Sequence, residues 1–345
     1  MMLLVERLLA GAMVVPFALG LAAGPADRKD VVLTFTDARI VESSGLVARG
    51  EVFVTVNDSG DDGRTFVVDR SGDTVGSASW GEATDVEAVA PWGRDSVLVG
   101  DIGDNAGQRD SVSVLRVPVE RGDRAVTPDV FELTYPGGPR DAEALLVHPV
   151  TRRIYVASKE LFGGTLYAAP REPSSTRPNR LQALGTVTGI VTDGAFFPDG
   201  RHLVLRDYGR AVVFAFPSLE PIGEVDLPDQ PQGEGIAVGA DGTVYVSTEG
   251  QFTSVLRVAL PADLREAVTP APSPTSTPTP TPTSTPTATP TPEPTSTPTT
   301  RSREGSELPE TTSTDRPFWP WFLTGWLGLG LIVVLIWSMR RRNTT

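Results

Sequence analysis

A short pattern recurs five times between residues 42 and 250 and constrains the fold of this chain more than any other feature. Each copy pairs a turn-like start with an apolar strand, and a second β-rich strand follows after a short turn. The copies read Glu42-Ser-Ser-Gly-Leu-Val, Asp85-Val-Glu-Ala-Val-Ala, Asp141-Ala-Glu-Ala-Leu-Leu-Val, Thr192-Asp-Gly-Ala-Phe-Phe and Gly233-Glu-Gly-Ile-Ala-Val. Equivalent positions are 43, 56, 51 and 40 residues apart, as in four-stranded propeller blades. The repeat predicts an all-β, five-bladed β-propeller over residues 28–266.

The strands expected after each copy indicate how the ring closes. Third strands are expected at residues 65–68, 112–117, 165–168, 211–216 and 254–258, and fourth strands at 74–80, 130–135, 182–189 and 221–227. The fifth unit lacks a fourth strand, and residues 31–40 can supply it, so that no sheet edge stays exposed. A sixth, degenerate blade between residues 119 and 139 is an alternative, and an open sandwich explains the repeat less well. No amphipathic helix is expected in this region.

The segments outside the repeat predict export and membrane anchoring. Residues 1–26 have the basic, apolar and small-residue order of a signal peptide, with an uncleaved anchor as the alternative. Residues 267–317 form a Pro/Thr/Ser-rich segment, and 29 of the 33 residues from 268 to 300 are Pro, Thr or Ser. Alternating Thr and Pro favours an extended stalk because proline lacks a backbone donor. The stalk composition also suits O-glycosylation.

The segment from residue 318 to 339 is uncharged and long enough for a helix that crosses a bilayer. The alternative is a buried core helix. Arg340, Arg341 and Arg342 follow it, and the positive-inside rule places residues 340–345 in the cytoplasm. We therefore expect a single-pass protein of the cell membrane with an extracellular propeller.

Composition excludes several classes of function. The chain has no cysteine, which removes disulfides, thiol catalysis and Cys-ligated metals, and its only histidines are His148 and His202. Residues 28–266 hold 23 basic and 36 acidic residues, a net charge of −13. Because a polyanion would be repelled, we expect no nucleic-acid partner.

Strand direction predicts where acidic side chains gather. The start of each first strand and the end of each second strand should lie on one face of the disc, and that face collects acids. First strands supply Glu87, Glu143, Asp193 and Glu234; second strands supply Asp58, Asp101, Glu160, Asp207 and Glu249, with Asn57, Lys159 and Arg206 between them. The candidate ligand-binding residues are Glu87, Glu143, Lys159, Arg206, Asp207 and Glu234. Each has a structural alternative, either capping of backbone donors or ion pairing.

Two similar turns supply a candidate metal site. Asp58-Ser-Gly-Asp-Asp and Asp101-Ile-Gly-Asp-Asn repeat after two second strands, and Asp58, Asp101, Asp104 and Asn105 offer oxygen ligands of the kind calcium prefers. The alternative is that Asp-x-Gly serves only the tight turn, in which Asp binds backbone and Gly takes positive φ. Calcium is the one cofactor that the sequence suggests.

The signature resembles a broad class of extracellular bacterial propellers. Gly233-Glu-Gly-Ile-Ala-Val-Gly-Ala-Asp-Gly-Thr-Val-Tyr-Val, together with Asp141-Ala-Glu-Ala-Leu-Leu-Val, is similar to gluconolactonase-like, strictosidine-synthase-like and phytase- or esterase-like families. The matching positions build blades, so the resemblance implies the fold and not an activity.

These observations favour a cell-surface propeller that binds a ligand, senses it or interacts with a protein. The competing hypothesis is a calcium-dependent hydrolase of a phosphoester, carboxylic ester or lactone, with Glu87, Asp101, Glu143 and Glu234 as ligands or base. A structural role as a cell-envelope spacer is a third possibility. The sequence contains no recognisable nucleophile and base pair, so catalytic residues stay unassigned.

Overall fold

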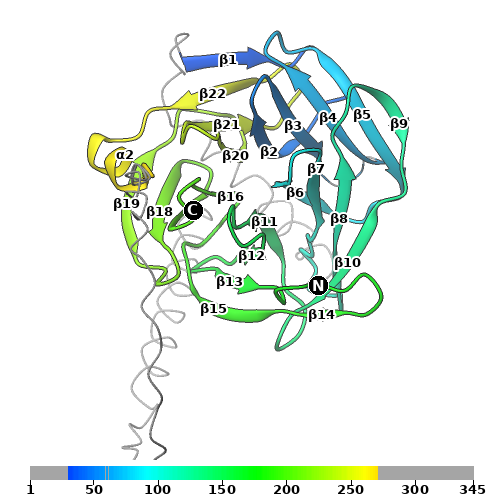
Figure 1. Ribbon diagram of the computed structural model, residues 1–345, viewed down its shortest axis with the longest axis vertical. Coiled ribbons are helices and arrows are strands. Elements are labelled where there is room, and N and C mark those ends of the chain that lie inside the picture. Colours follow the sequence, from blue (N-terminus) through cyan, green and yellow to red (C-terminus); the bar gives the residue numbers. More distant parts are fainter. Residues whose placement is uncertain (1–29, 59, 61, 271–345) are drawn as a thin grey trace, which may run out of the picture. The chain divides into compact units, whose positions relative to one another are not determined.

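The described part of the chain is a ring of five β-sheets. The computed structural model describes residues 30–58, 60 and 62–270, and Figure 1 shows the five sheets around a central axis. Within each sheet the first three strands run outward from the innermost strand and pair antiparallel with one another. The prediction of a five-bladed propeller is confirmed.

The blades follow the order of the repeat. Blade one contains β2 (Ser43–Arg49), β3 (Val52–Asn57), β4 (Gly63–Asp69), β5 (Thr74–Gly81) and β9 (Gly122–Ala125); blade two contains β6 (Val86–Trp92), β7 (Ser96–Asp101), β8 (Val112–Pro118), β10 (Asp129–Thr134) and β14 (Asn179–Arg180). Blade three contains β11 (Ala142–Val147), β12 (Ile154–Ser158), β13 (Thr165–Ala168) and β15 (Gln182–Thr186). Blade four contains β16 (Asp193–Phe196), β17 (His202–Arg206), β18 (Arg210–Ala215) and β19 (Pro221–Asp226); blade five contains β20 (Gly233–Val238), β21 (Val244–Thr248), β22 (Ser254–Val258) and β1 (Val31–Thr34).

The N-terminal strand closes the ring, as the sequence predicted. β1 pairs antiparallel with β22, and Leu33 lies opposite Val255. The ladder is extended by the backbone N–H of Phe35, which donates to the carbonyl of Thr253 at 2.9 Å. The strand ends at Thr34 rather than continuing to residue 40, but Phe35 and Ile40 are still fully buried.

The insert between residues 119 and 139 does not form a sixth blade, so that alternative is wrong. Its first part forms β9, which pairs parallel with β5 of blade one. Its second part forms β10, the fourth strand of blade two. The insert therefore widens two existing sheets and links them, which satisfies edge groups without adding a blade.

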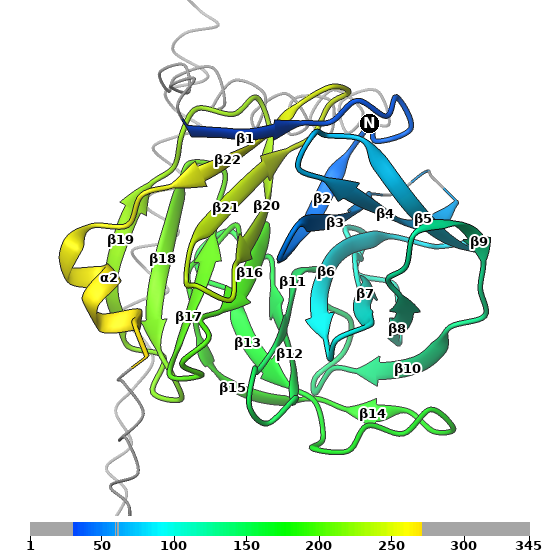
Figure 2. The same cartoon turned by 45° about the horizontal axis from the view of Figure 1, so that its top comes forward.

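One helix was not expected from the sequence. α2 (Ala262–Val268) follows β22 and buries only Leu264 and Val268, a pattern too short to recognise as amphipathic. Leu264 lies against Gly223 of β19, where a side chain would collide with it. In Figure 2, α2 lies beside the outer strand of blade four. The helix continues to Val268, past residue 266, which the sequence predicted as the end of the propeller domain.

Among the described residues, no helix is long and apolar enough to cross a membrane. The predicted signal peptide (1–26), the stalk beyond residue 270, the membrane span (318–339) and the tail (340–345) lie outside the described residues.

The hydrophobic core is divided among the five junctions between blades. Each cluster draws its side chains from two neighbouring blades, and the junction of blades five and one contains Leu33, Phe35, Phe53 and Tyr245. Because Leu33 and Phe35 belong to the closing segment, loss of that segment would open this junction to water. Ring closure thus depends on side-chain burial as well as on the β1–β22 ladder.

We expect Phe35→Ala to lower the free energy of unfolding by about 3–5 kcal/mol, the usual cost of emptying a buried phenylalanine site. The matched control is Val31→Ala on the same closing segment, because Val31 is 40% exposed and should change stability by less than about 1 kcal/mol. Urea denaturation followed by circular dichroism measures both. Equal effects of the two variants would contradict the proposed role of Phe35.

Candidate acidic site at one end of the channel

The innermost strands carry a β-bulge where the repeat places its acidic residue. In β6, Val86 lies opposite Asp101 and Ala88 opposite Gly100, so Glu87 is the extra residue. In β11, Glu143 is extra in the same way. β20 has one extra residue between Gly233 and Ile236, the stretch that contains Glu234. A bulge re-aims a side chain relative to the regular pleat, and these glutamates sit at equivalent points of the ring.

Blade four departs from this arrangement. β16 pairs with β17 without a bulge, and the position equivalent to the glutamates is Gly194. Its acidic residue is the preceding Asp193, which is fully buried. The Asp193 carboxylate accepts the backbone N–H of Gly194 at 2.7 Å and that of Ile236 at 2.8 Å. Asp193 therefore joins blade four to blade five, in agreement with the capping alternative.

The three glutamates differ in their partners. Each is about 4% exposed. Lys159 donates through Nζ to Glu143 and, at 3.2 Å, to the hydroxyl of Tyr208. Ser44 donates to Glu87 Oε2 over a long 3.4 Å. Among the described residues, nothing donates a hydrogen bond to the Glu234 carboxylate or forms an ion pair with it.

A second acidic cluster adjoins Glu87. Asp58, Asp85 and Glu87 each place a carboxylate oxygen within 4.8 Å of the other two. The loop after β7 packs closely against this cluster, since a Cβ at Gly103 would lie 2.4 Å from Asp85 Oδ2. Only glycine fits there without displacing a carboxylate. We call the following set the acidic mouth: Asp58, Asp85, Glu87, Glu143, Lys159, Tyr208, Glu234 and Glu249.

Burial and mutual repulsion raise the pKa values in the acidic mouth. Burial, helped by Asp58, raises the pKa of Asp85 to about 6 and that of Glu249 to about 7. Burial raises the pKa of Glu143 to about 8 against the opposing effect of Lys159. Burial and the charge of Glu143 also raise the pKa values of Glu87 and Glu234 well above their usual range.

The pKa of Lys159 depends more on its neighbours than on its burial. Burial would lower its pKa, but Glu143, Tyr208 and Glu234 outweigh that effect, and the pKa is raised. The acidic mouth therefore stabilises one positive charge strongly, even in a site largely removed from water.

The predicted metal ligands separate into two groups. Asp58 belongs to the acidic mouth. The Asp101 carboxylate instead accepts the backbone N–H groups of Thr84 and Asp85 at 2.9 and 3.1 Å. It also pairs with Arg109 at 2.8 Å. The Asp104 carboxylate accepts two backbone N–H groups of its own loop, at 2.8 and 2.9 Å, and Asn105 is exposed. This geometry favours the turn interpretation for Asp101 and Asp104.

Two predicted ligand-binding residues have structural partners. Arg206 is fully buried, and its guanidinium donates to the carbonyls of Gly235 at 3.0 Å and Ser247 at 3.3 Å, which belong to blade five. Burial lowers the Arg206 pKa to about 10, against nearby carboxylates. The Asp207 carboxylate accepts the backbone N–H of Arg210 at 2.7 Å in a tight turn. Neither side chain is left available to a ligand in this arrangement.

The structure adds Asp85 and Tyr208 to the candidates found from sequence. Asp85 was recognisable, because the pattern Asp-x-Glu-Ala occurs in both the second and third copies of the repeat. Tyr208 follows Asp207 in a turn and enters the mouth only because β17 lies next to blade three. No local pattern marks that contact.

Comparison with known proteins adds only the fold. No family model matches the chain, and no curated protein matches it. Solved structures that resemble it include the Dos1 propeller (13% identity, TM-score 0.35, 64% of this chain and 60% of that one) and a glucose dehydrogenase (15%, 0.39, 64% and 83%). An auxiliary nutrient binding protein from Bacteroides thetaiotaomicron is also similar (12%, 0.37, 67% and 64%). The chain thus spans about three fifths of the Dos1 propeller, and these likenesses assign no activity.

We expect the stability of the protein to fall by about 2 kcal/mol between pH 5 and 8.5. The mouth carboxylates have raised pKa values in the folded state, so the folded chain binds more protons than the unfolded chain above about pH 4.3. Asp37, whose side-chain hydrogen bond with Arg39 lowers its pKa to about 2, acts in the opposite sense but only below this window. Thermal unfolding across the pH range measures the effect.

The matched variants are Glu234→Gln in the mouth and Glu51→Gln in an exposed turn on the other face. Glu234→Gln should flatten the pH dependence, since one raised carboxyl no longer titrates, whereas Glu51→Gln should leave it unchanged. A stability that stays constant or rises from pH 5 to 8.5 would contradict the raised pKa values of the mouth carboxylates.

Proposed function

We propose that the acidic mouth binds a positively charged ligand and that the protein is a ligand-binding propeller. The observation that carries the proposal is the imbalance of buried charge. Of the three glutamates at equivalent bulges, only Glu143 forms an ion pair among the described residues, with Lys159, and Glu234 has no hydrogen-bond or ion-pair partner there. A buried carboxylate without a partner is costly, and an incoming cation would offset that cost.

The contact that Lys159 makes shows which ligand chemistry suits the mouth. Its ammonium lies between the carboxylate of Glu143 and the hydroxyl of Tyr208. A second ammonium would find similar acceptors at Glu234, whose carboxylate interacts electrostatically with Glu143 and Glu249. Complementary charge of this kind also steers association, which suits a protein with a net charge of −13.

Apolar side chains on neighbouring loops favour a ligand larger than a bare ion. Phe162 is 97% exposed and Leu161 67% exposed on the loop between β12 and β13, which also contains Lys159. Phe252 is exposed on the equivalent loop of blade five. Exposed aromatic residues beside a charged pocket are typical of binding surfaces. The mouth thus fits an ammonium-bearing ligand that also has an apolar part.

We propose that the protein is displayed at the cell surface, where the membrane span predicted for residues 318–339 anchors it. The three arginines that follow this segment support an orientation with the propeller outside the cell.

We expect hexylammonium to bind the full chain in detergent and n-hexanol, its neutral counterpart, to bind at least tenfold more weakly, because only the ammonium can pair with Glu234. Isothermal titration calorimetry at pH 8 measures both. Glu234→Gln should weaken hexylammonium binding about tenfold. Glu224→Gln, which removes an exposed carboxylate on the outer strand β19, should leave it unchanged. Equal affinity of the two variants, or equal binding of alcohol and ammonium, would contradict the proposal.

A calcium-dependent hydrolase is the second candidate, and the close approach of Asp58, Asp85 and Glu87 favours it. Three carboxylates within 4.8 Å of one another suit a hard divalent cation, which water could complete to six or more oxygen ligands. Calcium bound there would polarise an ester or phosphoryl oxygen. Glu143 and Lys159 would then be the nearest groups able to accept or hold a proton.

If this second candidate is correct, calcium should raise the melting temperature and support hydrolysis of p-nitrophenyl phosphate or p-nitrophenyl acetate that stops on addition of chelator. Asp58→Asn should abolish the calcium-induced rise, and Glu143→Gln should abolish turnover but not the rise. Glu224→Gln, on the outer strand β19, is the control. A calcium-induced rise without turnover would leave the binding function as the sole proposal.

A further inference from the structure

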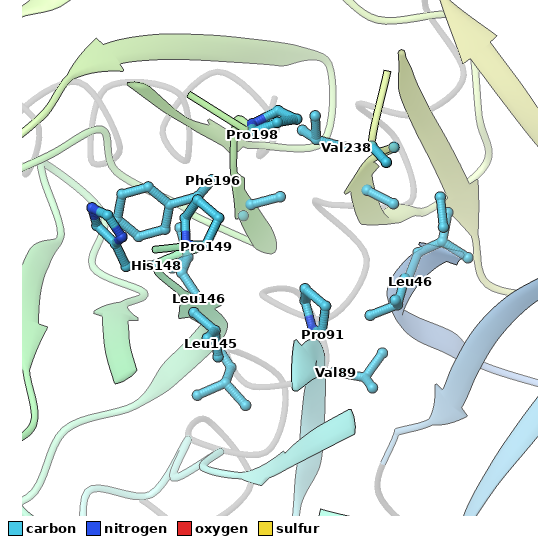
Figure 3. A pocket seen from close by; sticks show the side chains of 18 of the residues that line it. Leu46, Val89, Pro91, Leu145, Leu146, His148, Pro149, Phe196, Pro198 and Val238 are labelled. Carbon is cyan, nitrogen blue, oxygen red and sulfur yellow. The ribbon is translucent and has the colours of Figure 1, made fainter. Parts of the chain in front are cut away.

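The other end of the channel opens into an apolar cavity of about 400 Å³. All five blades line it with the second halves of their inner strands and the turns that follow, and Figure 3 shows these side chains around a central opening. We call this set the apolar mouth: Leu46, Val89, Pro91, Leu145, Leu146, His148, Pro149, Arg152, Phe196, Pro198, Val238 and Ala240. A cavity of this size and lining is typical of a site for a small organic ligand.

The apolar mouth has only two ionisable side chains, His148 and Arg152. The imidazole of His148 already has hydrogen-bond partners, because its Nδ1 accepts the backbone N–H groups of Val150 and Thr151 at 3.1 and 3.2 Å. Burial also lowers the His148 pKa and favours the neutral ring. Among the residues that line the cavity, Arg152 therefore supplies the charge.

Arg152 occupies a backbone position that the other blades give to glycine. The turn between first and second strands needs one residue with positive φ, and that residue is Gly50, Gly93, Gly200 or Gly242, with φ of 55°, 61°, 65° and 80°. In blade three it is Arg152, with φ of 57°. A side chain is strained in this conformation. Glycine would suit this turn better, so the arginine stands here against the local backbone preference.

The guanidinium of Arg152, an exposed residue at the cavity rim, stacks on an aromatic ring. It lies 4.6 Å from the ring centroid of Trp92. It also passes beside Gly93, which has no side chain to block it. Among the described residues, Arg152 makes no side-chain hydrogen bond or ion pair. Stacking on an aromatic ring orients a guanidinium while leaving its N–H groups free for a planar anion.

We propose that the apolar mouth is a second ligand site, which binds a monocarboxylate with an apolar body. The body fills the cavity between Leu46, Phe196 and Val238, and the carboxylate pairs with the guanidinium of Arg152. Burial of the apolar part supplies affinity, and the paired N–H donors of arginine select the carboxylate. This site does not depend on the acidic mouth, because it lies at the opposite ends of the same strands.

The test uses 4-phenylbutyrate and its neutral counterpart 4-phenylbutanamide, titrated calorimetrically into the full chain in detergent. We expect the carboxylate to bind at least tenfold more tightly than the amide. Arg152→Gly should remove that preference while the melting temperature stays equal or rises, because glycine suits the positive φ. Arg171→Gln removes an exposed positive charge from an outer loop and should leave both affinities unchanged.

A second variant tests the cavity separately from the charge. Ala240 is exposed at the cavity rim, so Ala240→Trp should obstruct the opening and weaken binding of both probes. The proposal is overturned if 4-phenylbutyrate does not bind the unchanged chain, if Arg152→Gly binds it as tightly, or if Ala240→Trp leaves binding of both probes intact.

Discussion

The close approach of the five inner strands around one axis is the constraint on which the rest of the structure depends. The residue after the repeat position occupied by Ser44, Glu87, Glu143, Gly194 or Glu234 is small in every blade: Gly45, Ala88, Ala144, Ala195 and Gly235. A Cβ at Gly45 would lie 2.4 Å from the backbone nitrogen of Val89 in blade two, and one at Gly235 would lie 3.0 Å from Leu46 Cβ in blade one. Larger residues would force neighbouring blades apart. The glutamates that precede this position in three blades are therefore held at a narrow part of the ring.

That confinement explains why the acidic mouth is electrostatically costly. Removing carboxylates from water is unfavourable unless hydrogen bonds or opposite charges replace the lost solvation. The buried cations respond differently: Arg206 binds carbonyl groups and joins two blades, whereas Lys159 binds Glu143 within the mouth. Among the described residues, Glu87 and Glu234 form no ion pair of this kind, although Lys159 lies close enough to lower both of their pKa values. The packing of all five junctions, including the one completed by Phe35, has to offset this local cost.

The repeat was sufficient to predict the five blades, the closing strand and the face on which acids gather, because period-2 strands and turn residues are local signals. It also identified Glu87, Glu143 and Glu234. It could not distinguish a carboxylate that faces the channel from one that caps a turn, since Asp58 and Asp101 begin nearly identical sequences. Burial and backbone partners separate them: Asp101 accepts two backbone N–H groups, whereas Asp58 joins Asp85 and Glu87.

The short strand β9 and the helix α2 were missed for a related reason. β9 is four exposed residues whose role is to cover the edge of β5, and α2 buries only Leu264 and Val268. Neither segment has enough periodic apolar residues to signal its structure locally. Both are stabilised by the blade edge or face that they cover, which is a property of the assembled ring.

The common direction of the inner strands makes the two ends of the channel chemically different. All five begin at the acidic mouth and end at the apolar mouth, so a residue's place in the repeat decides which end it reaches. A ligand site that is not the same in all five blades therefore requires single blades to depart from the repeat. Gly194 leaves blade four without a mouth glutamate, and Arg152 replaces a turn glycine in blade three. Because repeat positions are otherwise set by packing and turn geometry, such departures are where selection for a ligand can act without loss of the fold.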